Sequence, residues 1–190
     1  MISTSPRFDV VQTPLSGLSV VLRKPYQDTR GSFARLFCAR ELGELGMTQP
    51  VAQINHSITR DKGSVRGLHF QYAPHTDTKI VCCLSGEVFD VAVDLRPRSP
   101  TFLHWHAEIL SAQNRKSLYI PKGFAHGFQT LTEDCQLLYL HDGYYNPTSE
   151  GGLNVTDPQV GVVWPLPIAN LSTRDHSLPF IGSGFTGLPL

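Results

Sequence analysis

The stretch from Ser64 to Gln71 carries a cation, a glycine and a histidine within four positions, at Arg66, Gly67 and His69. The guanidinium group of arginine is a planar fork that suits phosphate oxygens, and histidine is the side chain most readily tuned to move protons near neutral pH. Each residue alone also has an ordinary structural interpretation, as a surface ion pair for Arg66 and as a hydrogen-bonded histidine for His69. Residues elsewhere in the chain must therefore decide whether this stretch does chemistry.

Four further side chains supply the remaining parts of a carbon-acid reaction, namely Lys79, His126, Tyr139 and Asp175. An imidazole such as His69 can take a proton from a weak carbon acid, and Asp175 can orient it and support its charged form, as carboxylates do in hydrolytic triads. Lys79 offers a positive charge to a developing oxyanion, and Tyr139 can return a proton from another direction. Taken singly, Lys79 also suits a strand edge, Tyr139 a core aromatic and Asp175 a loop cap. Together with His69 they indicate inversion of a carbon atom next to a ketone.

The segment Pro121-Lys-Gly-Phe-Ala-His126 places a histidine after a tight turn that follows an expected strand. It resembles the second motif of the cupin superfamily, whose members are antiparallel jelly rolls that often bind a metal ion. A metal-binding first motif needs a His-x-His pair and a carboxylate, whereas this chain has His69-Phe70-Gln71 at that place. His104 and His106 have ligand spacing because alternate residues share a strand face, but no acidic partner is fixed for them. We therefore predict no metal and no other cofactor, and a polar strand face at 104–106.

Length and composition favour one soluble globular domain spanning residues 1–190. The formal net charge is zero, with acidic and basic residues interleaved, which argues against nucleic acid or an anionic membrane as a partner. No apolar run approaches the length of a membrane span, and the first residues lack the apolar segment of a signal peptide. Cys38, Cys82, Cys83 and Cys135 show no paired metal spacing. We expect reduced thiols and a cytoplasmic protein.

Short apolar stretches separated by Gly, Pro, Asn or Asp dominate the chain and predict strands rather than helices. One short helix is expected at 39–46, with Leu42 and Leu45 on one face. Ser85-Gly86 is expected to turn the chain between two strands. Many short strands with regular turns favour a sandwich or barrel over a parallel α/β sheet, wrapped by a mostly irregular segment from Asn146. The predicted strands lie within 8–21, 32–37, 51–58, 78–84, 87–95, 105–110, 117–120, 127–132 and 136–141.

Together these segments resemble the dTDP-4-dehydrorhamnose 3,5-epimerase family of sugar-nucleotide epimerases, which are metal-free cupins. The resemblance runs from about Asp28 to about Asp175 and implies an all-β fold, a cupin-type antiparallel jelly-roll barrel with a few short helices. It is carried by Arg30-Gly31, Gln53-Ile-Asn55-His-Ser57, Gly63-Ser-Val-Arg-Gly-Leu-His69, Lys79, Gly86-Glu-Val-Phe-Asp-Val-Ala-Val-Asp-Leu-Arg96, Ser99-Pro-Thr-Phe102, Pro121-Lys-Gly-Phe-Ala-His-Gly-Phe128, Tyr139, Tyr145-Asn-Pro147, Glu150, Asp157-Pro158 and Trp164-Pro165.

The resemblance also implies a role for each matching side chain. His69 is implied as the base, Asp175 as its partner and Tyr139 as the acid on the opposite face of the sugar. Lys79 and His126 are implied to face the oxygen of the C4 carbonyl group. The implied substrate-binding residues are Arg66 and Arg174 for the diphosphate, and Arg30, Phe33, Gln53, Asn55 and Glu150 for the nucleotide or sugar. Because some of these come from the partner subunit in the family, the resemblance implies a homodimer with exchanged N-terminal strands.

Three functional classes stay open at this point. The leading one is an epimerase acting at C3, C5 or both on a nucleotide-linked 4-keto-6-deoxyhexose, with dTDP as the expected nucleotide. Arg35 stands where members of the family commonly carry a glutamate, and Leu140 where they tend to carry a lysine, so substrate selection stays open. The second class is another sugar-nucleotide cupin such as a 3,4-ketoisomerase, which the pairing of Tyr139 with His69 disfavours. The third is a binding module without catalysis, or a metal-dependent oxygenase.

Overall fold

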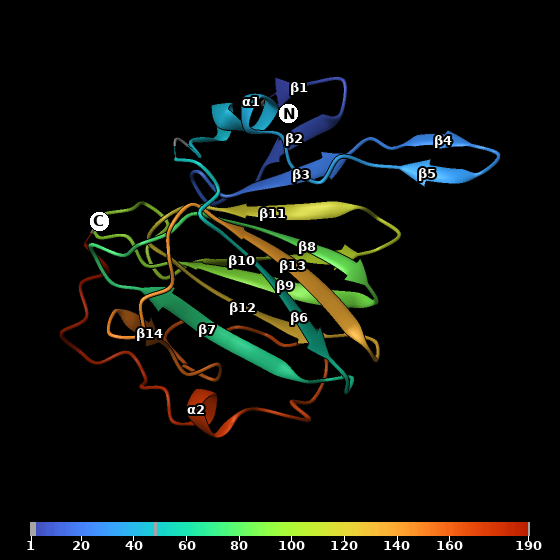
Figure 1. Cartoon of the computed structure of the whole chain (residues 1–190). Coiled ribbons are helices and arrows are strands. Elements are labelled where there is room, and N and C mark those ends of the chain that lie inside the picture. Colours follow the sequence, from blue (N-terminus) through green and yellow to red (C-terminus); the bar gives the residue numbers. More distant parts are fainter. Residues whose placement is uncertain (1–2, 48, 190) are drawn as a thin grey trace.

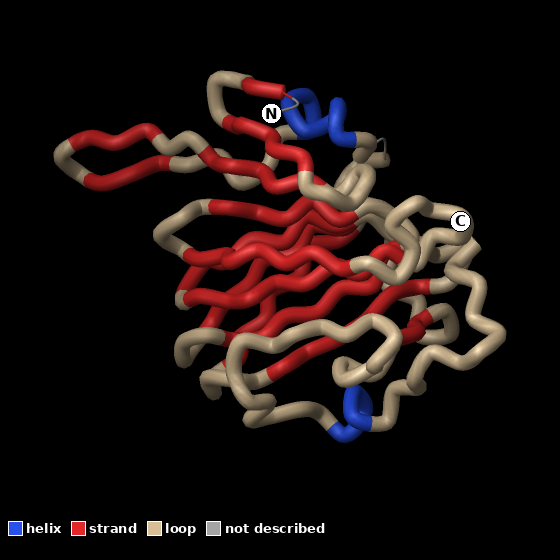
Figure 2. Tube along the Cα trace, turned by 180° about the vertical axis from the view of Figure 1, so that it is seen from behind, coloured by secondary structure: helices blue, strands red, loops and turns tan. Residues whose placement is uncertain are grey.

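The computed structural model describes residues 3–47 and 49–189, and β-strands form the body of the protein (Figures 1 and 2). Two short α-helices are present in the described part, α1 (Ala39–Leu42), which continues into one 3-10 turn (Gly43–Leu45), and α2 (Thr173–His176). The strands are β1 (Ser3–Thr4), β2 (Phe8–Gln12), β3 (Ser19–Arg23), β4 (Tyr26–Asp28), β5 (Gly31–Phe33), β6 (Gln53–Thr59), β7 (Val65–Gln71), β8 (Lys79–Ser85), β9 (Glu87–Asp94), β10 (Trp105–Ser111), β11 (Lys116–Ile120), β12 (Phe124–Thr130), β13 (Cys135–His141) and β14 (Glu150–Gly152).

The strands form two antiparallel sheets and a separate hairpin. The larger sheet has seven strands in the order β1-β2-β3-β11-β8-β13-β6, and the smaller has five in the order β10-β9-β12-β7-β14. Among the described residues, strands β4 and β5 pair only with each other, and their hairpin projects away from the two sheets (Figure 1). The antiparallel all-β architecture with a few short helices confirms the prediction from the sequence.

Several predicted boundaries differ from the observed ones. The strand predicted at 32–37 ends at Phe33, and β12 begins at Phe124, three residues before its predicted start. The turn at Ser85-Gly86 exists, but it does not close a hairpin, because β8 and β9 lie in different sheets. Gly86, with a φ of +75°, carries the chain from one sheet to the other.

Three apolar layers hold the sheets in place. Between the sheets, side chains such as Val81 and Phe128 form one core cluster. Helix α1 and the 3-10 turn cover the outer face of the seven-stranded sheet, where Leu42 packs in a second cluster. The C-terminal segment covers the outer face of the five-stranded sheet, and Val155 and Ile181 belong to that third cluster. This segment is mostly irregular and wraps the barrel, as predicted, although it also contains β14 and α2.

The approach of β7 to β12 depends on two glycines. Gly67 has a φ of +138°, a conformation that side chains with a Cβ rarely adopt. A Cβ atom on Gly67 would lie 2.6 Å from the Cα atom of Gly127. The register of the two strands shifts next to this contact, between His126 and Phe128. The close contact therefore helps to set the register in which His69 of β7 lies opposite His126 of β12.

Two further expectations concern the cysteines and membranes. Cys82 and Cys83 belong to the cores on opposite faces of the seven-stranded sheet. All four cysteines are free thiols, and Cys38 is the one that is half-buried rather than buried. No helix within the described residues has the length and apolar character needed to cross a membrane.

Candidate active site

A cavity of about 660 Å³ lies between the two sheets, a size that falls within the range of small-molecule sites. The seven-stranded sheet lines it through β6, β8 and β13, and the five-stranded sheet through β7, β12 and β14. The C-terminal segment around α2 closes one side. Its lining residues are Asn55, His56, Ser57, Thr59, Ser64, Val65, Arg66, His69, Lys79, His126, Phe128, Tyr139, His141, Glu150, Asn170, Ser172, Arg174 and Asp175.

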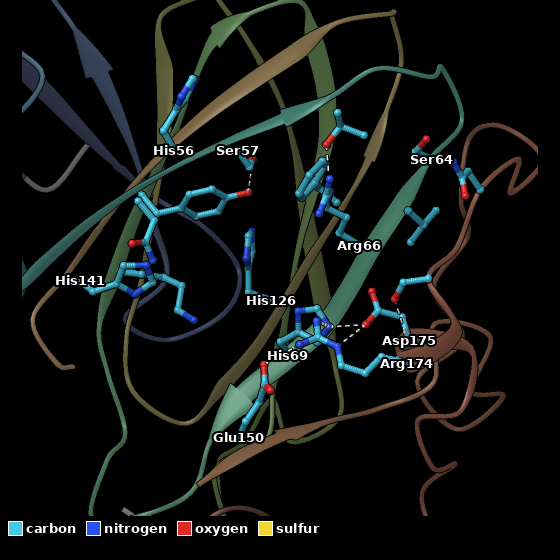
Figure 3. Close-up of a pocket in the computed structure, with 18 residues that line it drawn as sticks. His56, Ser57, Ser64, Arg66, His69, His126, His141, Glu150, Arg174 and Asp175 are labelled. Carbon is cyan, nitrogen blue, oxygen red and sulfur yellow. Dashed lines mark hydrogen bonds and ion pairs between the residues drawn. The ribbon is translucent and has the colours of Figure 1, made fainter. Parts of the chain in front are cut away.

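His69 is held by the carboxylate of Asp175, which comes from α2 (Figure 3). The Nε2 atom of His69 lies 2.8 Å from Oδ1 of Asp175, and the backbone N–H of Gly67 donates to Oδ2 at 3.3 Å. The Ser172 hydroxyl caps the helix by accepting a hydrogen bond from the Asp175 N–H at 3.0 Å. Because a carboxylate only accepts, the contact requires a proton on Nε2. The Nδ1 atom of His69 is then the free basic atom of this imidazole.

The Asp175 carboxyl group is almost fully buried and stays ionised. Burial on its own raises the pKa of Asp175, but the hydrogen bond and charge of His69, together with the Gly67 N–H and Arg174, outweigh it and bring the pKa to about 2. An ionised partner supports the positive charge that His69 gains when it accepts a proton. The pair therefore has the arrangement of an oriented general base.

His126 stands opposite His69 in the paired strands and has a carboxylate of its own. Its Nε2 atom lies 3.0 Å from both carboxylate oxygens of Asp90, whose side chain is fully buried. Asp90 extends from β9, the strand on the other side of β12. Its carboxylate fixes the orientation of the His126 ring, so the ring presents a defined edge to the cavity.

Tyr139 faces the cavity from the opposite sheet. Its hydroxyl group lies 3.1 Å from the Ser57 hydroxyl of the neighbouring strand β6. Burial raises the pKa of Tyr139 well above the ordinary value, and the hydrogen bond with Ser57 offsets only part of this effect. The phenol is thus protonated at neutral pH and can donate a proton into the cavity.

Lys79 and His141 meet at the carboxylate of Asp77. The Oδ2 atom of Asp77 lies 2.7 Å from Nδ1 of His141 and 3.6 Å from Nζ of Lys79. The His141 ring also stacks on Tyr139, with ring centroids 6.2 Å apart and an interplanar angle of 22°. A cation, an imidazole and a phenol therefore share one wall of the cavity.

Two arginines bring positive charge to the cavity from the side of β7 and α2. Arg66 donates from Nε to the Thr59 hydroxyl at 2.9 Å. Arg174 donates from Nη1 to Glu150 at 2.9 Å, and its Nη2 lies 2.9 Å from Nε2 of His69. Nε2 of His69 cannot donate a hydrogen bond to Asp175 and accept one from Arg174 at the same time. The charged, buried acceptor is the stronger partner.

The structure brings together most of the residues predicted from the sequence. Nine of the twelve line the main cavity, and Gln53 lines a smaller hollow that shares Asn55, His69 and Lys79 with it. Arg30 and Phe33 do not line either hollow of this chain. Both are exposed on the β4–β5 hairpin, where Arg30 pairs with Asp28 at 2.6 Å. The nine residues in the main cavity are Asn55, Arg66, His69, Lys79, His126, Tyr139, Glu150, Arg174 and Asp175.

The described residues contain no group of three or more His, Cys, Asp or Glu side chains that could hold a metal ion. Gln71, at the first-motif position where a metal cupin carries its second histidine, donates from Nε2 to the His75 carbonyl oxygen at 2.9 Å. His106 pairs with Glu108 at 3.2 Å within β10, as expected of a polar strand face.

A comparison with known sequences decides the family. The sequence profile described as dTDP-4-dehydrorhamnose 3,5-epimerase matches residues 12–182. The chain belongs to the dTDP-4-dehydrorhamnose 3,5-epimerase family. A curated member of this family from Salmonella typhimurium is 41% identical over 174 residues, which cover 90% of this chain and 94% of the relative. Membership confirms the resemblance and identifies the protein as an isomerase of the epimerase class.

Solved structures of the epimerase family share the same fold. A dTDP-6-deoxy-D-glucose-3,5-epimerase from Legionella pneumophila, in complex with dTDP-4-keto-L-rhamnose, has a TM-score of 0.89 and 38% identity, covering 96% of this chain and 99% of that chain. A 3′-monoepimerase from Streptomyces bikiniensis, in complex with dTDP-quinovose, has a TM-score of 0.82 and 31% identity, covering 88% of this chain and 85% of that chain. Enzymes described as acting at one centre and at two centres are therefore both similar to this epimerase-family chain.

Sequence reasoning missed several residues of the site. Asp90, Asp77, His141 and Ser57 were not predicted as site residues, although each contacts a residue that was. Alternation along the strand could have found His141, because it lies two residues after Tyr139 and shares its face. The contact of Asp90 with His126 joins two strands, and no local sequence pattern indicates it.

Proposed function

We propose that this protein inverts C3 and C5 of a dTDP-linked 4-keto-6-deoxyhexose, as its relatives' names describe. One observation carries the proposal. His69 with its buried partner Asp175 and the protonated Tyr139 face one cavity from opposite sheets. A base and an acid on opposite sides of a carbon atom are what an inversion requires, because a proton removed from one face must return to the other.

The chemistry follows from the acidity of carbon atoms next to a ketone. Nδ1 of His69 takes a proton from C3 or C5, and the electron pair moves into the C4 carbonyl group to give an enolate. Lys79 stabilises the negative oxygen by its charge, and His126 lies on the same side of the cavity as His69 to assist it. Tyr139 returns a proton to the opposite face of the carbon atom. The catalytic residues of the proposal are thus His69, Asp175, Lys79 and Tyr139.

Binding of the diphosphate falls to Arg66 and Arg174, whose guanidinium groups suit phosphate oxygens. In the structure Arg66 donates to the Thr59 hydroxyl and Arg174 to the carboxylates of Glu150 and Asp175, so a diphosphate would compete for these donors. Gln53, Asn55 and Glu150 lie at the neighbouring hollow and are placed to contact the nucleotide or the sugar.

The exposed hairpin supports a proposal about assembly. Arg30 and Phe33 match positions that line the pocket in the family, yet here they lie on a hairpin that projects away from the sheets (Figure 1). An exposed Phe33 and Tyr26 on such a hairpin favour contact with a second copy of the chain. We propose a homodimer with exchanged N-terminal strands, in which the hairpin of each subunit completes the site of the other.

The proposal also covers the domain organisation, the absence of a cofactor and the location of the enzyme. Residues 1–190 form one cupin-like epimerase domain, and the reaction uses proton transfer by side chains, without a cofactor. The enzyme works in the cytoplasm, where thiols such as Cys83 and Cys135 stay reduced.

The proposal is tested by incubation with dTDP-4-keto-6-deoxyglucose in heavy water, followed by proton NMR of the sugar. Deuterium at both C3 and C5 with inversion at both is the expected result. Deuterium and inversion at one centre alone would indicate a single-centre epimerase, the second candidate, which the similarity to a 3′-monoepimerase favours. Migration of the carbonyl group would indicate a ketoisomerase instead, and no exchange at either carbon atom would overturn the proposal.

A further inference from the structure

Asp77 is a buried acid that the mechanism above leaves without a role. Its side chain is 5% exposed, yet it contacts two side chains that line the cavity, His141 at 2.7 Å and Lys79 at 3.6 Å. Gln71 donates from Nε2 to the other carboxylate oxygen at 3.4 Å. Both oxygens of a buried carboxylate are thus occupied by groups at the edge of the site.

The strand register explains why these three side chains meet. His141 of β13 and Lys79 of β8 are direct partners in the ladder, so their side chains extend from the same face of the sheet. Asp77 lies two residues before Lys79, where the chain enters β8. The N–H of Thr78 donates to the Asp142 carboxylate at 2.6 Å, and the Asp142 N–H donates to the Thr78 carbonyl oxygen at 3.1 Å. This double contact fixes the segment that carries Asp77.

We propose that Asp77 and His141 are positioning residues for Lys79. His141 donates its Nδ1–H to Asp77, and the carboxylate so fixed holds the ammonium group of Lys79 at the cavity wall where the enolate oxygen forms. The inference rests on the proposed function, because it assigns to Lys79 the stabilisation of that oxygen.

The physical argument is one of preorganisation. A lysine side chain is flexible, and a charge that moves away from the reacting oxygen stabilises it less. The Asp77 carboxylate is suited to hold the ammonium group of Lys79 because it stays ionised. Burial on its own raises the pKa of Asp77, but the charge of Lys79 and the hydrogen bond from His141 outweigh it and leave the pKa well below the ordinary value.

The first test compares Asp77→Asn with the wild type in turnover and in dTDP binding. We expect kcat to fall about tenfold to hundredfold, by analogy with the loss of an outer-shell partner that orients a metal ligand. The Kd for dTDP, measured by calorimetry, should change less than about threefold, because Asp77 is paired with Lys79, His141 and Gln71 and not with the phosphate-binding arginines. In a Lys79→Ala background the same substitution should have no further effect on kcat, since residues acting through one group are not additive. A multiplicative effect in that background would overturn the inference.

The second test uses the geometry of the His141 ring and does not disturb Asp77 itself. In His141→Asn the amide nitrogen takes the place of Nδ1 and can still donate to Asp77, whereas in His141→Gln it takes the place of Nε2 and cannot. We expect His141→Asn to keep kcat within about threefold of the wild type and His141→Gln to lose about tenfold or more. The reverse order would overturn the inference, because it would mean that Nε2 acts on the substrate directly.

His106→Asn is the matched control, since His106 also pairs with a carboxylate, that of Glu108 at 3.2 Å, but outside the cavity. Its kcat should equal that of the wild type. Wild-type protein that exchanges no deuterium would overturn the proposed function, whereas normal exchange with an unchanged kcat in Asp77→Asn and His141→Gln would overturn this inference alone.

Discussion

His69 and His126 are direct partners across strands β7 and β12, yet each meets a buried carboxylate from a different part of the chain. The partner of His69 is Asp175 in the C-terminal helix, and the partner of His126 is Asp90 in the next strand of the sheet. In both rings the carboxylate holds Nε2 and leaves Nδ1 as the other ring nitrogen.

The base assignment predicts the outcome of His69→Gln. The side-chain amide of glutamine can still donate to Asp175 but cannot accept a proton from carbon. We expect kcat to fall by about 10²–10⁴-fold, deuterium exchange at C3 and C5 to disappear, and the Kd for dTDP to change little. Kinetics, NMR exchange and calorimetry check the three points. Exchange that persists in this variant would show that another group is the base.

The acid assignment predicts a different loss in Tyr139→Phe. This variant keeps His69, so deuterium exchange should continue while net inversion is lost. Ser57→Ala is the companion variant, because it removes the hydrogen bond at 3.1 Å but leaves the phenol in place. We expect it to retain inversion at a rate reduced by less than about tenfold, in line with the loss of one hydrogen bond. Unchanged inversion in Tyr139→Phe would rule out Tyr139 as the acid.

The proposed exchange of hairpins between subunits predicts complementation between two inactive chains. An Arg30→Ala/Phe33→Ala chain and a His69→Gln chain should each form a dimer, with a mass twice that of the 21.0 kDa subunit. In a mixed dimer, the first chain has an intact His69 and receives an intact hairpin from the second. One site per mixed dimer should therefore be active. Activity no higher than that of the two separate variants would show that each hairpin serves its own subunit.

Buried Asp94 predicts how stability depends on pH. Its side chain is fully buried and accepts hydrogen bonds from Arg96, Ser99 and Thr101 at 2.6–2.8 Å. Burial on its own raises the pKa of Asp94, but these hydrogen bonds outweigh it and bring the pKa to about 2, below the ordinary value of 3.8. A depressed pKa stabilises the folded state above the unfolded value, and this contribution is lost as the pH falls through about 2.

Asp94→Asn should therefore be less stable than the wild type at pH 7, by roughly 2 kcal/mol from the pKa shift alone. The difference should shrink as the pH falls from about 4 towards 2. Urea unfolding at a series of pH values measures it, and a difference independent of pH would contradict the assignment. Asp28→Asn is the control, because the Asp28–Arg30 pair is exposed and should contribute little.

The contact between β7 and β12 predicts unequal effects of two glycine substitutions. Gly67 and Gly31 have similar φ angles, +138° and +132°, but a Cβ atom at Gly31 would meet no atom within 4 Å. Gly31→Ala should therefore show backbone strain alone, of about 1–3 kcal/mol. Gly67→Ala adds the collision with Gly127 and should destabilise by several kcal/mol and lower kcat by displacing His69. Equal melting temperatures for the two variants would mean that the strands adjust without cost.

Some strands and the position of some residues could be predicted from the sequence alone. Strand alternation and turn residues were sufficient to predict β9 and β13, and hence that Tyr139 lies on a strand. Strand alternation also accounts for Leu140, at the position where the resemblance leads us to expect a lysine. It is buried in the outer core under α1, on the face away from Tyr139, and does not line the cavity. Arg35 likewise lies outside the cavity and pairs with Glu41.

Other features depend on contacts that no local pattern contains. The pairing of Asp77 with His141 joins residues 64 positions apart, and it follows from a register that the sequence does not specify. The length of β5 was overestimated, because 34–37 have strand-like residues but no neighbouring strand with which to pair. Of the unpredicted site residues, Asp90 and His141 lie on interior strands, and their contacts depend on strands that are distant in the sequence.

The separation of His69 and Asp175 has a consequence for biosynthesis of the protein. The base is translated 106 residues before the carboxylate that orients it. During synthesis the strands of both sheets emerge from the ribosome first, and α2 emerges after all of them. The strands can therefore assemble while His69, the proposed base, still lacks the carboxylate that orients it, and the proposed site is completed only after α2 has emerged.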